Sequence, residues 1–124
     1  MKNFSPKQQE KYKRQKYIRA LSKSTKNLFK LFRSQESSYE CYKKRFSKLK
    51  EDIDNLEKIH LNSEYLRAVD TYLEQLYKKT IQEQTLTEQQ FQELKSIELS
   101  NLNRLQKLKN QKKYSKEKYR KDIF

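Results

Sequence analysis

The chain has 124 residues, a length typical of one domain, with 33% hydrophobic and 37% charged residues. This mixture is too polar for a compact multilayer core and is typical of disorder or of a long coiled coil. The sequence contains no Gly, one His and one Cys, which disfavours phosphate-cradling loops and excludes both a His/Cys metal site and an internal disulfide. It has neither the long apolar run of a membrane span nor a signal peptide, so we expect a cytoplasmic protein.

The formal net charge is +14, and most of it lies at the two ends of the chain. Residues 1–33 carry 11 basic and 1 acidic side chains, residues 101–124 carry 9 and 2, and the middle carries 10 and 13. Codon bias in an AT-rich genome would explain the abundance of Lys. It explains the clustering of Lys at both ends less well, and binding to anionic surfaces is the alternative.

The first predicted helix begins at Pro6, because Ser5-Pro6-Lys7-Gln8 has the pattern of an N-cap followed by Pro and Gln. Steps of three and four residues then connect a series of mostly large apolar side chains: Ile18, Leu21, Thr25, Leu28, Phe32, Gln35, Tyr39, Tyr42, Phe46, Leu49, Ile53, Leu56 and His60. This heptad pattern is typical of a coiled coil. A kink at Ser34 to Ser38 is possible, but the heptads continue through it, so we expect one helix over about 6–60.

The next segment, 61–63, is predicted to be a turn, since Asn62 and Ser63 are good helix caps. A second helix is expected over about 64–119, with its apolar seam at Leu66, Val69, Leu73, Leu76 and Thr80. The seam returns in shifted phase from Phe91, which makes Thr85 to Glu88 the place where this helix would break.

Two amphipathic helices of similar length joined by a short turn predict an all-α fold, a long antiparallel two-helix coiled-coil hairpin that uses 1–124 as a single unit. A parallel homodimer of one interrupted helix is the alternative. The hairpin would bring the basic ends together in a basic tip formed by Lys11, Lys13, Arg14, Lys16, Lys112, Lys113, Lys116 and Lys118.

No pattern of catalytic residues is apparent, so we expect a protein that is not an enzyme and has no cofactor, metal or small-molecule substrate. The one tight carboxylate cluster, Glu51, Asp52 and Asp54, lies among lysines and is interpreted as a solvated helix face. His60 is assigned a structural role at the end of the seam. Cys41 is interpreted as an exposed thiol with no base beside it.

The stretch TYLEQLYKKTIQEQ, residues 71–84, resembles the second helix of the FliJ family of flagellar type III export proteins and of its YscO-type relatives. Tyr72, Leu73, Leu76 and Gln82 occupy the positions that carry the resemblance. Lys79 and Glu83 depart from it, as does the basic C-terminal end. The resemblance covers roughly residues 30–113.

This resemblance implies a role in flagellar biosynthesis: a stalk and general chaperone that links the hexameric export ATPase to the cytoplasmic domain of the export gate and meets substrate chaperones. It also implies a location at the flagellar base, peripheral to the inner membrane. The implied partner-binding residues are Phe46, Ile53, Tyr65, Tyr72 and Leu76, although the same residues can pack over the seam instead. The alternative function is a basic helical module that binds RNA or the ribosome.

Overall fold

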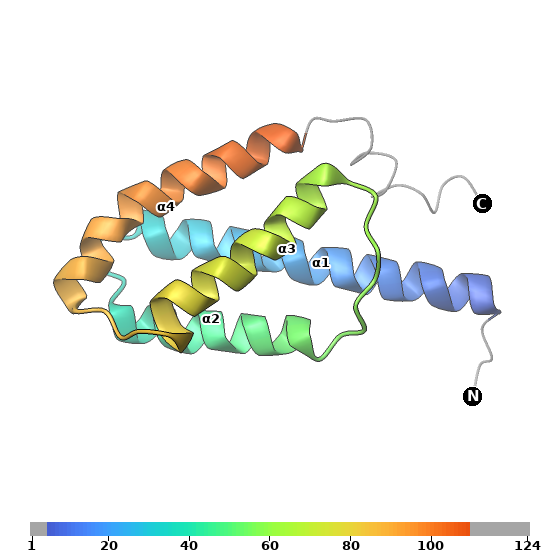
Figure 1. Cartoon of the computed structure of the whole chain (residues 1–124), viewed down its shortest axis with the longest axis horizontal. Helices are drawn as coiled ribbons and strands as arrows, with labels where there is room; N and C mark the ends of the chain where they lie inside the picture. The colour runs from blue at the N-terminus through green and yellow to red at the C-terminus, as the bar shows by residue number, and fades with distance from the viewer. Residues whose placement is uncertain (1–4, 110–124) are drawn as a thin grey trace.

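In the computed structural model, which describes residues 5–109, every element of secondary structure is a helix (Figure 1). The elements are α1 (Pro6–Arg33), α2 (Tyr39–Asp54), α3 (Glu64–Tyr77), the short π-helix η1 (Lys78–Gln82), which continues α3, and α4 (Glu88–Leu108). The predicted all-α class is therefore confirmed for the described part of the chain. That the whole chain forms one domain stays a prediction.

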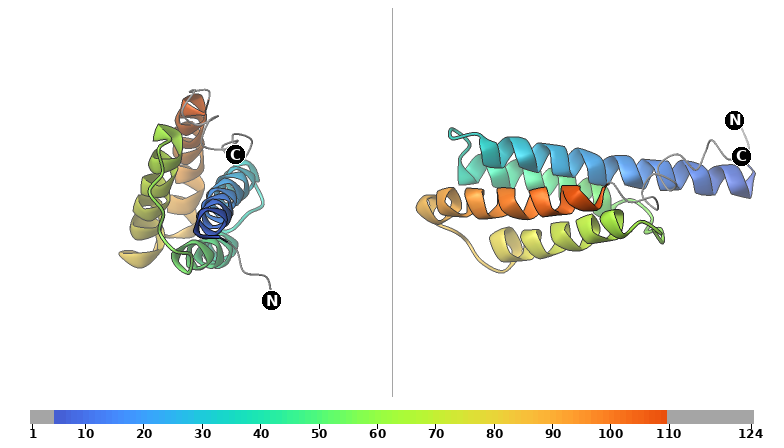
Figure 2. Two further views of the ribbon diagram at one scale, coloured as in Figure 1. Left: turned by 90° about the vertical axis from the view of Figure 1, so that its right-hand side faces the viewer. Right: turned by 90° about the horizontal axis from the view of Figure 1, so that it is seen from above.

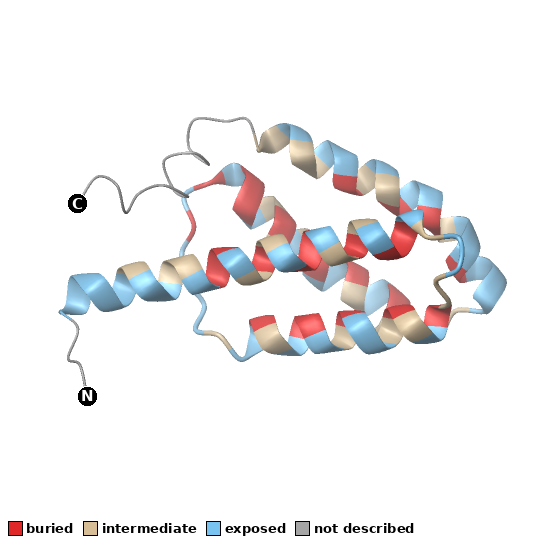
Figure 3. Cartoon of the chain, turned by 180° about the vertical axis from the view of Figure 1, so that it is seen from behind, coloured by how far each residue is buried: buried red, intermediate tan, exposed pale blue. Residues whose placement is uncertain are grey.

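Successive helices run in alternating directions and pack as a four-helix bundle, with α1 and α2 on one side and α3 and α4 on the other (Figure 2). The first turns of α1 extend beyond the ends of the other three helices. These turns are mostly exposed, whereas the rest of α1 is buried along one side (Figure 3).

Three of the helices begin at residues whose side chains cap the helix N-terminus. Ser5 and Gln8 form a capping box at the start of α1, as predicted, and the Ser63 side chain accepts a hydrogen bond from the Leu66 backbone N–H at the start of α3. At α4 the capping box is formed by Gln90 and Thr87, and Thr87 lies in the segment Thr85 to Glu88 where the break was predicted.

The structure corrects the predicted pair of long helices, because each of them is interrupted. The first ends at Arg33, and Ser38 caps a new helix by accepting a hydrogen bond from the Cys41 backbone N–H. Between them the Ser37 hydroxyl donates hydrogen bonds to the carbonyls of Leu31 and Ser34. Such bonds from a side chain to the backbone compete with the hydrogen bonds that would continue the helix. The predicted three-residue turn is a longer connection from 55 to 63, and the second helix breaks at 83–87. Its predicted end near 119 lies outside the described residues.

The two breaks lie against each other, so the structure corresponds to the predicted hairpin folded in half. The Lys95 ammonium donates to the backbone carbonyls of Ser34 and Ser37, each at 2.8 Å. The Glu88 carboxylate accepts from the Tyr39 backbone N–H at 3.1 Å. The antiparallel pairing of α1 with α4 and of α2 with α3 is retained, and the fold adds contacts of α1 with α2 and of α3 with α4.

The apolar positions of the predicted heptad series form the core. From Ile18 to Ile53 every member of the series is buried except Gln35, which lies in the first break. Beyond α2 the series no longer follows the structure, since Leu56 is half-buried and His60 is exposed. The centre of the core is aromatic: the Phe91 ring of α4 lies 5.0 Å from the ring of Tyr42 on α2, centroid to centroid.

Candidate anion-binding interface

The five residues expected to bind a partner lie within the bundle. Phe46, Ile53, Tyr65 and Leu76 are buried in the core, and Tyr72 is half-buried and packs against it. The sequence allowed these residues either to bind a partner or to pack over the seam, and in the structure they pack. In this fold Tyr72 is the one member of this set that is partly exposed.

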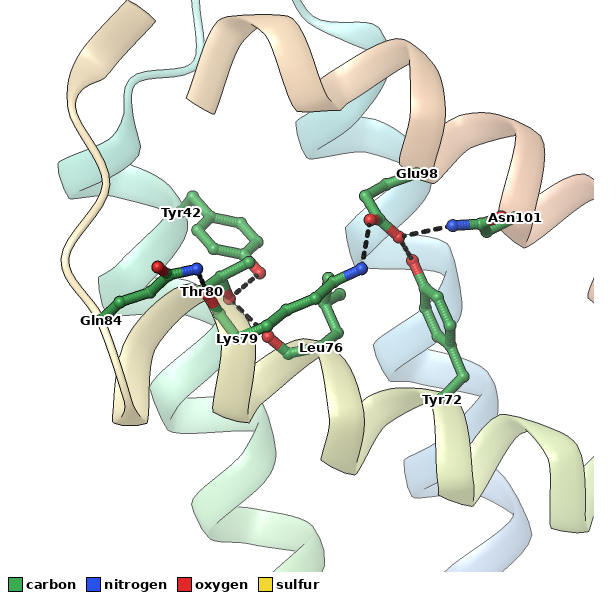
Figure 4. A network of polar contacts seen from close by, with 8 residues as sticks. All are labelled: Tyr42, Tyr72, Leu76, Lys79, Thr80, Gln84, Glu98 and Asn101. Atoms are coloured by element: carbon green, nitrogen blue, oxygen red, sulfur yellow. Dashed lines mark hydrogen bonds and ion pairs between the residues drawn. The ribbon is translucent and has the colours of Figure 1, made fainter. Parts of the chain in front are cut away.

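Tyr72 instead belongs to a polar network centred on Glu98 of α4 (Figure 4). The Glu98 carboxylate, only 2% exposed, accepts hydrogen bonds from the Tyr72 hydroxyl at 2.7 Å, the Lys79 ammonium at 2.8 Å and the Asn101 amide at 3.1 Å. Burial raises the pKa of Glu98, but these donors outweigh it, so the pKa lies below its usual range. Burial beside this carboxylate raises the pKa of Tyr72. A buried carboxylate with this many partners holds α3, η1 and α4 together and is not a free acid or base.

A second buried group of hydroxyls surrounds Thr80 in η1. The Thr80 hydroxyl donates to the Leu76 carbonyl at 2.6 Å and lies 2.8 Å from the Tyr42 hydroxyl, while the Tyr39 hydroxyl donates to the Thr80 carbonyl. Hydroxyl groups thus donate hydrogen bonds to the Leu76 and Thr80 carbonyls where the helix widens to the π form. Because these carbonyls have partners, η1 is tolerated although Thr80 is buried.

The N-terminal half of the predicted basic tip lies on the projecting turns of α1. Lys13 forms an ion pair with Glu57 at 2.7 Å, and Arg14 donates to the His60 carbonyl at 3.3 Å. Lys11 and Lys16 belong to the same turns. These contacts anchor the base of the projection to the 55–63 connection. The other four tip residues (Lys112, Lys113, Lys116 and Lys118) lie outside the described residues.

A longer basic surface follows α1 along its exposed side. After Glu10 this helix contains no acidic residue, and its exposed cations recur every three or four residues. We call this set the α1 basic row: Lys16, Arg19, Lys23, Lys26, Lys30 and Arg33. Within residues 5–109, no ion pair is formed by Arg19, Lys23, Lys26 or Lys30. Their charge is therefore not cancelled by a carboxylate in the described part of the chain.

An open groove of about 410 Å³ lies between α1 and α2, beside this row. Its lining is Lys23, Asn27, Lys44, Arg45, Lys48, Leu49 and Asp52. Lys48 pairs with Asp52 at 3.0 Å, and this hydrogen bond raises the pKa of Lys48. The groove exists because the chain folds back at Ser34 to Ser38, which places the cations of α2 beside those of α1. The sequence showed the excess of charge on α1, but not that Lys44 and Arg45 extend it.

The two sides of the bundle differ in charge. Residues 64–108, which include α3, η1 and α4, carry 7 acidic and 6 basic side chains, whereas α1 and α2 together carry 15 basic and 5 acidic. Because α1 and α2 form one side and α3 and α4 the other, the molecule has a strongly basic side. Such a surface attracts an extended anion over a distance of about 8 Å at physiological salt.

Other kinds of site receive no support in the part of the chain that the structure describes. Across residues 5–109 there is no cluster of three or more potential metal ligands. None of the helices in this range is both long and apolar enough to cross a membrane. The Cys41 thiol is half-buried against the core and not fully exposed as predicted.

Comparison with protein-family models, with curated proteins and with solved structures found no match to this chain.

Proposed function

We propose that this protein is a non-enzymatic module that binds nucleic acid through the α1 basic row and the adjoining groove. The observation that carries the proposal is the continuity of this surface. From Lys16 to Arg33 the exposed side of α1 presents only cations and neutral residues, and α2 adds Lys44 and Arg45 across the groove.

The length and composition of the row suit a phosphate backbone. At about 1.5 Å per residue the row extends for about 25 Å, enough to follow several consecutive phosphates. Lysines predominate, and a lysine is a flexible point charge that does not impose the bidentate geometry of arginine. Contacts of this type supply affinity that is independent of sequence and sensitive to salt. We therefore propose general binding to the backbone, without recognition of particular bases by hydrogen bonds.

A second candidate is the role in flagellar protein export suggested by the resemblance of residues 71–84. The projecting basic turns of α1 and the antiparallel pairing of α1 with α4 support it, because such an end is able to meet the export ATPase ring. In this role the protein would act as an adaptor between that ring, the export gate and substrate chaperones. The folded bundle is shorter than a two-helix stalk, and four of the five proposed partner-binding residues are buried, so the geometry favours the first candidate.

A pull-down of the full chain from a native lysate, with and without nuclease, tests both candidates. We expect nucleic acid to be captured at low salt, to be released as salt increases and to disappear after nuclease treatment. Capture of the export ATPase or gate proteins that survives nuclease, with no bound nucleic acid, would contradict the proposal and favour the export role.

A further inference from the structure

Tyr12 stands out among the aromatic residues that the structure describes. Its side chain is 59% exposed, whereas the other tyrosines between residues 5 and 109 are buried or half-buried. It lies in the first turns of α1, where every other residue from Lys7 to Lys16 is polar or charged. Tyr12 does not belong to the hydrophobic cluster of the core, so packing does not explain an aromatic residue at this position.

The residues around Tyr12 suit the binding of a nucleobase better than the binding of an apolar protein surface. The Lys16 ammonium lies 5.8 Å from the centre of the Tyr12 ring, one helical turn away, and Lys16 is the first residue of the α1 basic row. Lys11 and Lys13 are its neighbours in the sequence. An apolar partner would have to desolvate these cations, whereas a nucleotide presents a flat base to the ring and a phosphate to the ammonium.

We propose that Tyr12 is a base-stacking residue and that the ligand of this surface is single-stranded nucleic acid. This inference rests on the proposed function and specifies its substrate class. The bases of a duplex are already stacked on each other and are not available to an isolated ring on the outside of a helix. In a single strand one base stacks on Tyr12 while the backbone continues along the α1 basic row toward the groove.

Binding of the full chain to three labelled ligands tests this assignment by fluorescence anisotropy: an oligouridine strand, an abasic strand of equal length and a duplex of equal length. The variants are Tyr12→Ala and Tyr12→Phe, and Ile97→Ala is the matched control, since Ile97 is 60% exposed on α4, away from the row. Circular dichroism of each variant verifies that the bundle is intact.

We expect Tyr12→Ala to weaken oligouridine binding about tenfold, the usual effect of losing one stacked base, and to change abasic and duplex binding by less than about twofold. Tyr12→Phe and Ile97→Ala should bind like the parent. Equal weakening for all three ligands, or unchanged oligouridine binding, would overturn the role of Tyr12 while leaving backbone binding intact. If the parent binds none of the three ligands, the proposed function fails as well.

Discussion

Replacing Lys23, Lys44 and Arg45 together by Glu is expected to weaken nucleic-acid binding by about 100-fold at low salt. These cations line both walls of the groove between α1 and α2, so reversing them places repulsive charge where the phosphates are proposed to lie. Each lost phosphate contact lowers the slope of log affinity against log salt by about 0.7 for a single strand, hence by about 2 in all. Anisotropy titrations of a labelled single strand over a range of salt concentrations measure both effects.

The matched control is the replacement of Arg67, Arg104 and Lys107 by Glu. These three cations are exposed on α3 and α4, and the replacement changes the net charge by the same amount. If the affinity depends on the groove, this control should lose much less affinity and keep most of the salt slope of the parent. Equal losses in the two variants would show that total charge determines binding, which would contradict an interface on α1 and α2.

Replacing Phe91 by Ala is expected to lower the free energy of unfolding by about 3–5 kcal/mol, the usual cost of removing a buried aromatic ring. Phe91 is fully buried, and its ring centroid lies 5.0 Å from that of Tyr42, 5.6 Å from Tyr39 and 6.4 Å from Phe32. The ring of one α4 residue thus holds the end of α1 and the start of α2. Since domains of this size are stabilised by about 5–15 kcal/mol in total, the variant would be close to unfolding.

Urea denaturation followed by circular dichroism measures this loss. Ile97→Ala on the same helix is the control and should change the free energy of unfolding by less than about 0.5 kcal/mol, because Ile97 is mostly exposed. A Phe91→Ala variant as stable as this control would show that α4 does not pack on the break between α1 and α2.

The core face was predictable from the sequence, whereas the path of the chain was not. An amphipathic helix buries the same side whether it is long and straight or divided into two, so the positions from Ile18 to Ile53 identify the core in both cases. The heptads therefore gave no information about the break between Phe32 and Tyr39. The serines there indicated a possible kink, but local chemistry alone did not outweigh the continuing pattern.

What stabilises the break comes from a distant part of the chain. The Lys95 ammonium, which binds the carbonyls of Ser34 and Ser37, is 61 and 58 residues away in sequence. The Glu88 carboxylate, which binds the Tyr39 N–H, is 49 residues away. Contacts of this range depend on the whole fold, and no local spacing rule indicates them.

The candidate site, too, was predictable only in the part that depends on local sequence. The cations of α1 were visible as a charge excess, but the groove requires α2 to lie beside α1. The residues assigned to partner binding from the resemblance, such as Tyr72 and Leu76, would be partly exposed in a two-helix hairpin. The fold covers them because folding the hairpin in half adds a second pair of helices around them.

The distance between spin labels at residues 23 and 48, in a chain whose single Cys41 is replaced by Ala, tests most directly whether the chain folds back to form the groove. Both residues line that groove, so double electron–electron resonance should give a distance below about 25 Å, as expected for labels on adjacent packed helices. In an unbroken helix the 25 intervening steps would separate them by about 38 Å. A single distribution near that longer value would contradict the four-helix bundle and the basic interface built on it.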